Sequence, residues 1–258
     1  MVRISILLLF WLAGGPVREQ VLKPPPMVAA EERGRTVTKT KAGAPRSNAE
    51  WTMQRAQLDG REAVKMTESG RGFYSGFDQE VQWEVEAWWS AGDAFRPLHV
   101  ERTVSEKSGK ALMRERKQFD WSKNEVRFER HDLVKDKTTA KTLQSPVDTL
   151  APEGIAGALR SLPFAPDARF PAHLLTNEPK IYTVTFEIRG RETIRTAAGS
   201  FDCYKVEAVP HIGALDAFRV LFPKVYFWFT VKAPHSWVRY QGPENGPGST
   251  EIVLERAE

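Results

Sequence analysis

A strand that is apolar on both faces places the strongest constraint on the fold of this chain. In the run VYFWFTV, Val225, Phe227 and Phe229 alternate onto one side, while Tyr226 and Trp228 lie on the other. An antiparallel sheet can leave one face in water, but burying a large apolar side chain is worth roughly 1.5–3 kcal/mol. Both faces of this strand are therefore expected to be covered.

The same period of two recurs along most of the chain. The run VQWEVEAWW at residues 81–89 sets Trp83 and Trp89 on one face, and Glu84 and Glu86 on the other. Other runs of this kind lie at residues 98–104, 126–134, 181–190, 191–209, 236–242 and 249–257, with a hairpin tip at 122–125. Runs close in sequence are expected to pair, which predicts a mainly β protein with one antiparallel, curved sheet or half-barrel.

One short helix is expected to cover this sheet. Over residues 153–162, Leu159 and Leu162 belong to an apolar stripe at helical spacing. Gly154 and Gly157 weaken such a helix by about 1 kcal/mol each relative to alanine. It must therefore dock on the sheet to persist, and it would supply cover for exposed rings.

The N-terminus indicates export. Residues 1–15 combine a basic Arg3, the apolar run ISILLLFWLA and two glycines, as in a secretory signal peptide. The run is shorter than the about 20 residues that span a bilayer, and an uncleaved anchor is the alternative. Residues 16–50, rich in proline and scattered cations, are expected to be a flexible linker, followed by a single β-rich domain at 51–258.

The balance of charge and the cysteine count narrow the class further. Lys plus Arg is 37 against 33 for Asp plus Glu, so the net charge of +4 is mild and predicts no nucleic-acid partner. Cys203 is the only cysteine, which excludes an intramolecular disulfide, and its place in an alternating strand predicts a buried, inert thiol. The periplasm or cell envelope of a bacterium is the expected location, with no membrane span in the mature chain.

Catalytic signals are weak. The sequence contains no Gly-x-Ser-x-Gly elbow, and its five histidines lack the spacings of zinc sites. Glu84 and Glu86 would stand about 6.6 Å apart along a strand, close to the about 6.5–9.5 Å of inverting glycosidases. A solvated polar face explains this pair better. No catalytic residue, metal or cofactor is therefore expected, and the protein is predicted not to be an enzyme.

Aromatic residues supply the candidate binding site. Core packing is the default explanation for them, but rings that line a concavity could instead hold an acyl chain. The candidate apolar lining consists of Trp83, Trp88, Trp89, Tyr226, Trp228 and Trp237.

The C-terminal half resembles a bacterial family known as domain of unknown function 3108. The resemblance rests on RGRETIRTAAGSFDCYKVE at residues 189–207, the aromatic strand, GPGSTEIVLE near the C-terminus and LRSLPF at 159–164. It covers residues 147–255, and departs from the family in a helical insert expected at 211–222 and in the turn KAPHSW. The resemblance implies an exported bacterial protein, a sheet curved like that of outer-membrane lipoprotein carriers, and no assigned activity.

These observations lead to three hypotheses for function. The leading one is a non-enzymatic exported protein that binds or carries an apolar envelope ligand, a lipid or lipidated protein, in a pocket between sheet and helix. The alternative is a structural or scaffold protein of the envelope that acts by protein contacts. An envelope hydrolase using paired carboxylates ranks last.

Overall fold

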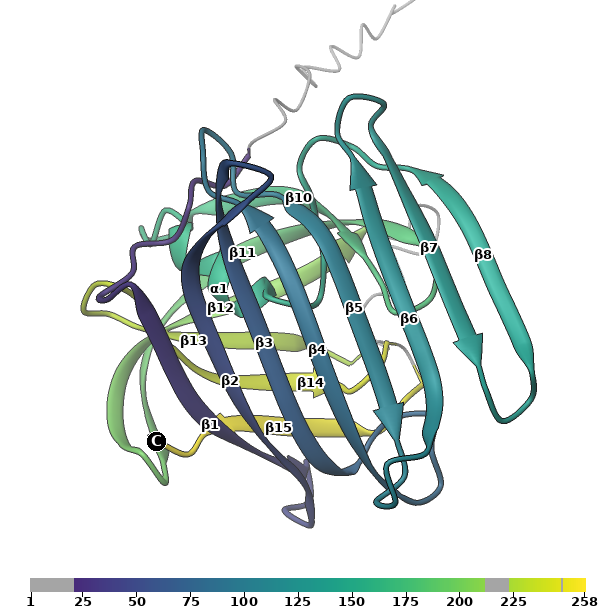
Figure 1. The fold of residues 1–258 in the computed structure, drawn as a ribbon. Helices are drawn as coiled ribbons and strands as arrows, with labels where there is room; N and C mark the ends of the chain where they lie inside the picture. Colours follow the sequence, from purple (N-terminus) through teal and green to yellow (C-terminus); the bar gives the residue numbers. More distant parts are fainter. Residues whose placement is uncertain (1–20, 212–222, 247) are drawn as a thin grey trace, which may run out of the picture.

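A computed structural model describes residues 21–211, 223–246 and 248–258 of the chain. The signal segment at 1–15 and nearly all of the insert expected at 211–222 lie outside the described residues. Fifteen strands form one sheet (Figure 1). The first eight are β1 (Glu31–Thr40), β2 (Pro45–Leu58), β3 (Arg61–Phe73), β4 (Glu80–Ser90), β5 (Pro97–Ser105), β6 (Ala111–Asp120), β7 (Glu125–Asp132) and β8 (Lys137–Gln144). The others are β9 (Thr149–Leu150), β10 (Arg169–Leu175), β11 (Ile181–Thr196), β12 (Gly199–His211), β13 (Val225–Thr230), β14 (Trp237–Pro243) and β15 (Glu251–Arg256).

The strand order is β8-β7-β6-β5-β4-β3-β2-β1-β15-β14-β13-β12-β11-β10-β9. Neighbouring strands are antiparallel, except that β9 and β10 are parallel. The chain begins in the middle of the sheet, runs by meanders to the β8 edge, crosses to the β9 edge and returns to pair β15 with β1. The predicted mainly β, antiparallel, curved architecture is confirmed.

The expected linker at residues 16–50 is wrong from residue 31 onward. Strand β1 pairs on both sides, with Thr36 opposite Ala49 of β2 and opposite Arg256 of β15. Thr36 and Thr38 are buried. The segment has few large apolar residues because a central strand flanked on both sides has its backbone satisfied by its neighbours, so small β-branched side chains are enough to hold it.

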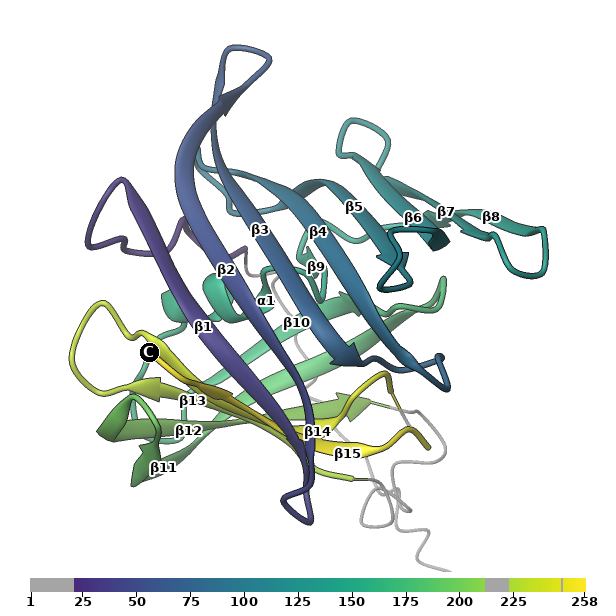
Figure 2. The same ribbon diagram turned by 60° about the horizontal axis from the view of Figure 1, so that its bottom comes forward.

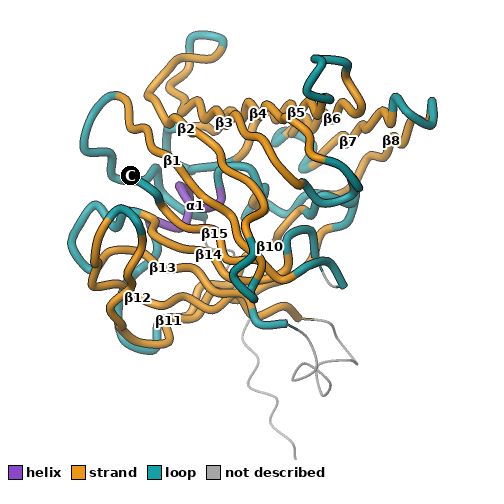
Figure 3. The backbone as a smooth tube through the Cα atoms, turned by 90° about the horizontal axis from the view of Figure 1, so that it is seen from below, coloured by secondary structure: helices purple, strands orange, loops and turns teal. Residues whose placement is uncertain are grey.

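The sheet bends until its two halves face each other across the short helix α1 (Ile155–Ala158) and the 3-10 turn η1 (Leu159–Ser161), as Figures 2 and 3 show. The side of the sheet turned toward this helix is called the concave face below. One apolar core on that face joins buried residues of both halves to Ala158, Leu159 and Leu162. The covering helix expected over residues 153–162 is confirmed in place and is shorter.

The two glycines at this helix permit its close docking. A Cβ atom on Gly154, whose φ is 87°, would lie 2.4 Å from Met66 Sδ, and one on Gly157 would lie 2.8 Å from Met66 Cε. Both positions therefore give up helix propensity and allow the backbone to approach the floor of the sheet.

The aromatic strand β13 is covered on both faces, as the alternation requires. Phe227 and Phe229 belong to the concave core, whereas Trp228 lies in a separate cluster on the other face with Cys203 and Val238. Lys205 Nζ lies 5.4 Å from the centre of the Trp228 ring and helps to cover it. The helix covers the phenylalanine face, and side chains of neighbouring strands cover the tryptophan face.

Candidate functional site

The structure distributes the six aromatic candidates over separate places and does not bring them together in one pocket. Trp89 is fully buried in the concave core, and its Nε1 donates to the carbonyl of Glu153 at 3.2 Å. Trp237 packs at the margin of the same core. Trp83 lies in a second cluster with Val104.

The remaining three lie away from the concave face. Tyr226 and Trp228 pack together on the other side of β13, with ring centres 5.8 Å apart. Trp88 lies on the outer face of β4, where Lys65 Nζ sits 5.2 Å from its ring centre. Trp83, Trp89 and Trp237 therefore contribute to the concave side, and Trp88, Tyr226 and Trp228 do not.

The acidic pair expected to be solvated on β4 is partly engaged in local contacts. Glu86 accepts a hydrogen bond from Trp88 Nε1 at 2.7 Å and pairs with Lys65 Nζ at 2.7 Å. The hydrogen bond from Lys65 is the main reason that the pKa of Glu86 is lowered from its ordinary value. A general acid needs the opposite shift.

Cys203 and the histidines supply no reactive cluster among the residues that the structure describes. Cys203 is buried, as expected, and burial raises the pKa of its thiol to about 12, so the thiol stays protonated near neutral pH. No group of three His, Cys, Asp or Glu side chains within the described ranges is placed to hold a metal ion.

A row of charged residues crosses the concave face and forms the candidate site. Arg102 of β5, Glu115 of β6 and Arg130 of β7 stand directly opposite one another in the strand register. Glu68 of β3 lies further along the same row, beyond Val85, and accepts a hydrogen bond from Trp83 Nε1 at 2.7 Å. Charges of alternating sign opposite each other across strands are mutually stabilising.

Lys117 completes the network from the adjacent row. It stands between Val100 and Phe128, and all three residues are fully buried. Its Nζ lies 3.2 Å from Glu115 and 2.7 Å from Glu153. A lysine in apolar surroundings requires such partners, because an unpaired buried ammonium is strongly unfavourable.

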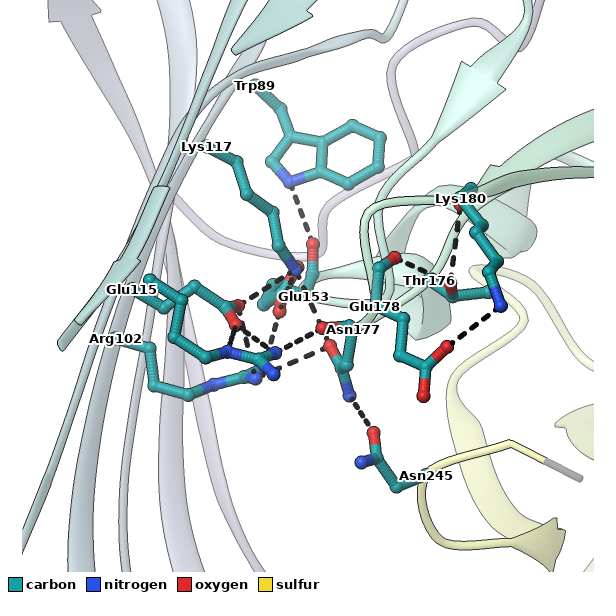
Figure 4. Close-up of polar contacts among 11 residues, drawn as sticks. Trp89, Arg102, Glu115, Lys117, Glu153, Thr176, Asn177, Glu178, Lys180 and Asn245 are labelled. Carbon is teal, nitrogen blue, oxygen red and sulfur yellow. Dashed lines mark hydrogen bonds and ion pairs between the residues drawn. The ribbon is translucent and has the colours of Figure 1, made fainter. Parts of the chain in front are cut away.

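Glu153 and Asn177 bring this network together from distant parts of the chain (Figure 4). Glu153 precedes α1 and pairs with Arg102 as well as with Lys117. The Asn177 side chain, in the turn between β10 and β11, accepts from Arg102 at 3.3 Å and donates to Asn245 at 2.8 Å. The Asn177 carbonyl accepts from Arg130. The network therefore joins the two halves of the sheet. The name polar network is used below for Arg102, Glu115, Lys117, Arg130, Glu153 and Asn177.

The electrostatics of the polar network keep it charged. Burial alone would raise the pKa of Glu153, but Lys117 and Arg102 outweigh burial and lower that pKa to about 2. Burial likewise acts to lower the pKa of Arg102, and Tyr74 together with Glu153 and Glu115 raises it instead. Burial raises the pKa of Tyr74 to about 12, so its hydroxyl remains a hydrogen-bond donor near neutral pH.

A cavity of about 210 Å³ opens beside the polar network. Arg102, Arg130 and Asn177 line it on one side. Its other lining residues come from three loops and strand ends: Tyr74, Ser75, Gly76, Phe77, Leu112, Met113, Asp132, Glu244 and Asn245. Two buried atoms of the network have no hydrogen-bond partner among the described residues, Arg102 Nε and Glu153 Oε2.

The sequence contained a signal for this site that the period-two reading did not use. Val100, Arg102 and Val104 alternate onto one face of β5, and Met113, Glu115 and Lys117 do so on β6. A charged residue at an apolar position of a strand predicts an inward-pointing charge that needs a partner. Glu153 and Asn177 carried no such signal, because their distant contacts depend on how the sheet bends.

Within the described ranges, none of the helices has the length and apolar character to cross a bilayer.

The family comparison agrees with the resemblance at the C-terminal half and extends it. The family described as "Protein of unknown function (DUF3108)" matches residues 36–254. The chain belongs to this family. The match to DUF3108 takes in strands β2 to β8 as well as the later strands, so the polar network lies wholly inside the family domain.

Two solved structures are similar to this DUF3108 protein at 10% sequence identity. One is described as a "putative exported protein with YmcC-like fold" from Bacteroides fragilis; the alignment covers 92% of this chain and 98% of that chain, with a TM-score of 0.36. The other is described as a "putative lipoprotein" from Parabacteroides distasonis, with coverage of 93% and 99% and a TM-score of 0.34. No curated protein matches the chain.

Proposed function

We propose that this DUF3108 protein is an exported, non-enzymatic binding protein of the bacterial periplasm or cell envelope, and that it binds a small polar ligand, or the polar end of a larger one, in the cavity beside the polar network. Export rests on the signal-like segment at residues 1–15. The absence of catalytic activity is part of the proposal.

The cavity carries this proposal. Ligand sites combine a concavity with a few polar groups held in fixed positions. Here Arg102 projects from a strand and is held by Glu115 and Glu153, so its guanidinium is oriented before any ligand arrives. Such preorganisation lowers the entropy cost of binding.

The apolar version of the binding hypothesis receives less support. The space between helix and sheet is occupied by the chain itself, since Ala158 and Leu159 are fully buried in the concave core with Trp89. A volume of about 210 Å³ is also below the about 300 Å³ at the low end for ligand pockets. A lipid or lipidated protein would therefore place its polar end here, and the acyl chain would need another place.

A scaffold role is the second candidate, and strand β8 is the observation that favours it. Its residues are exposed almost throughout, and it pairs with β7 on one side only. An edge strand of this kind can accept a strand from another protein.

Native mass spectrometry of protein purified from its own envelope tests the binding role. The wild type is expected to carry an added mass, and a Ser75→Trp variant, which fills the cavity from its lining, is expected to lose it. Ser108→Trp, on the exposed turn between β5 and β6, is the matched control and should keep the added mass. Repeated spectra of the bare wild-type chain, or equal added mass in both variants, would overturn the proposal.

A further inference from the structure

We infer that the cavity recognises an anionic group, a phosphate or a carboxylate, through Arg102 and Arg130. This inference rests on the proposed binding role and specifies its ligand chemistry. It follows from the charges, the unpartnered donor, the aromatic wall and the size of the cavity.

The polar network holds more cations than acids. Arg102, Lys117 and Arg130 share two carboxylates, Glu115 and Glu153. The next acid in the row, Glu68, is separated from Arg102 by Val85 and bonds Trp83. An additional anion beside the arginines would therefore meet a local excess of positive charge, in a place where the surrounding protein strengthens the attraction.

The two acids in the cavity wall have partners away from the arginines. Glu244 accepts from Arg46 Nη2 at 2.7 Å. Asp132 accepts from the backbone N–H groups of Val134 at 3.1 Å and Lys135 at 3.0 Å. Their contacts leave the two guanidinium groups as the principal charged groups available to a ligand.

Arg102 also retains an unused donor. Its side chain is buried and lines the cavity, yet Nε has no partner among the described residues. A buried donor without a partner costs about 1–3 kcal/mol. A guanidinium presents its N–H groups in a planar fork that matches the oxygens of phosphate and carboxylate. A ligand oxygen in the cavity would satisfy this donor.

The opposite wall fits a small group with an oxygen-rich end. Tyr74 and Phe77 line the cavity with aromatic rings, and the Arg102 guanidinium lies 5.8 Å from the centre of the Tyr74 ring. The Tyr74 hydroxyl adds a neutral donor. A cavity of about 210 Å³ is about seven times the volume of one liquid water, which suits a phosphate or a short carboxylate rather than a whole lipid.

Calorimetric titration with inorganic phosphate and with succinate tests the inference, at constant ionic strength and with chloride as the reference anion. Saturable binding of at least one probe is expected, and the stronger probe identifies the ligand class. Arg130→Gln is expected to weaken that binding about tenfold or more, because a hydrogen bond to a charged group is worth about 1.5–3 kcal/mol. Arg127→Gln, on the exposed face of the same strand, should bind as the wild type does.

Asp132→Asn separates a specific loss from a folding defect. Removing this negative charge from the cavity wall is expected to strengthen anion binding about two- to threefold, an increase that misfolding cannot produce. Absence of saturable binding to both probes, or equal affinity in Arg130→Gln and Arg127→Gln, would overturn the inference. If the protein still carries an added mass from its envelope that Ser75→Trp abolishes, the binding role stands and only the anionic chemistry fails; if it carries none, the binding role fails as well.

Discussion

A charged side chain on the buried face of a strand persists only where its partners are already in place, and Glu115 shows this at the scale of one residue. Its fully buried carboxylate is the shared acceptor of three cations: Arg130 Nε at 2.8 Å, Lys117 at 3.2 Å and Arg102 at 3.4 Å. Removing one member of a buried ion pair is costly chiefly because the other charge is left without compensation. The cost therefore depends on what remains, not on how many contacts are lost.

This reasoning predicts an asymmetry between two substitutions. Glu115→Gln leaves three cations with Glu153 alone, and should lower the free energy of unfolding by about 3–5 kcal/mol. Lys117→Met leaves two arginines with two carboxylates and should cost less than half as much. Urea denaturation followed by tryptophan fluorescence measures both. Glu101→Gln is the control, since Glu101 pairs with Arg116 at the surface and should contribute at most about 1 kcal/mol. Equal costs for Glu115→Gln and Lys117→Met would contradict the argument.

At the scale of the element, the helix shows how a weak segment is held by what it covers. Helix α1 has four residues, far too few to be stable alone, and it is fixed because its glycines let it approach Met66 and Trp89. A Cβ on Gly154 would lie 2.8 Å from Trp89 Nε1, the group that bonds the Glu153 carbonyl. Docking of the helix and placement of Glu153 are thus parts of one arrangement.

Gly154→Ala is expected to lower the free energy of unfolding by about 2–4 kcal/mol, because it adds overpacking to a positive φ. Gly157→Ala should cost less, since its φ is not positive and the nearest atoms belong to flexible methionines. Gly92→Ala, where a Cβ would have no neighbour within 4 Å, is the control and should be nearly neutral. Thermal unfolding by circular dichroism gives the ranking, and a Gly154→Ala protein as stable as Gly92→Ala would refute it.

Elements of this protein were predictable from sequence to the extent that their partners were local. Alternation in VQWEVEAWW predicted β4, and the apolar stripe predicted the helix, because both patterns are read within one segment. Strand β1 was missed because its stability comes from β15, more than 200 residues later in the chain. The polar network was missed for the same reason, since Arg102 meets Glu153 and Asn177 only after the sheet has bent.

At the scale of the whole molecule, the polar network acts as a clamp between the two halves of the sheet. Arg102, Lys117 and Arg130 belong to strands β5 to β7, whereas Asn177 comes from the turn before β11 and Glu153 from the segment before α1. The large apolar core joins the same two halves. Stability of the whole domain should therefore depend on the charge of this clamp.

Acid should weaken the clamp through Glu153. Its pKa is about 2 in the folded protein against an ordinary value of 4.5, so ionised Glu153 stabilises the fold above pH 4.5, and this contribution is lost as the pH falls toward 2. A shift of this size corresponds to about 3 kcal/mol. Glu153→Gln lacks the titrating group, so the difference in unfolding free energy between wild type and variant is expected to be constant above about pH 5 and to shrink between pH 4.5 and 2. Chemical denaturation at half-unit pH steps measures it, with Glu101→Gln as the control for general titration of surface carboxylates. A difference that stays constant down to pH 2 would show that Glu153 is not held ionised by Lys117 and Arg102.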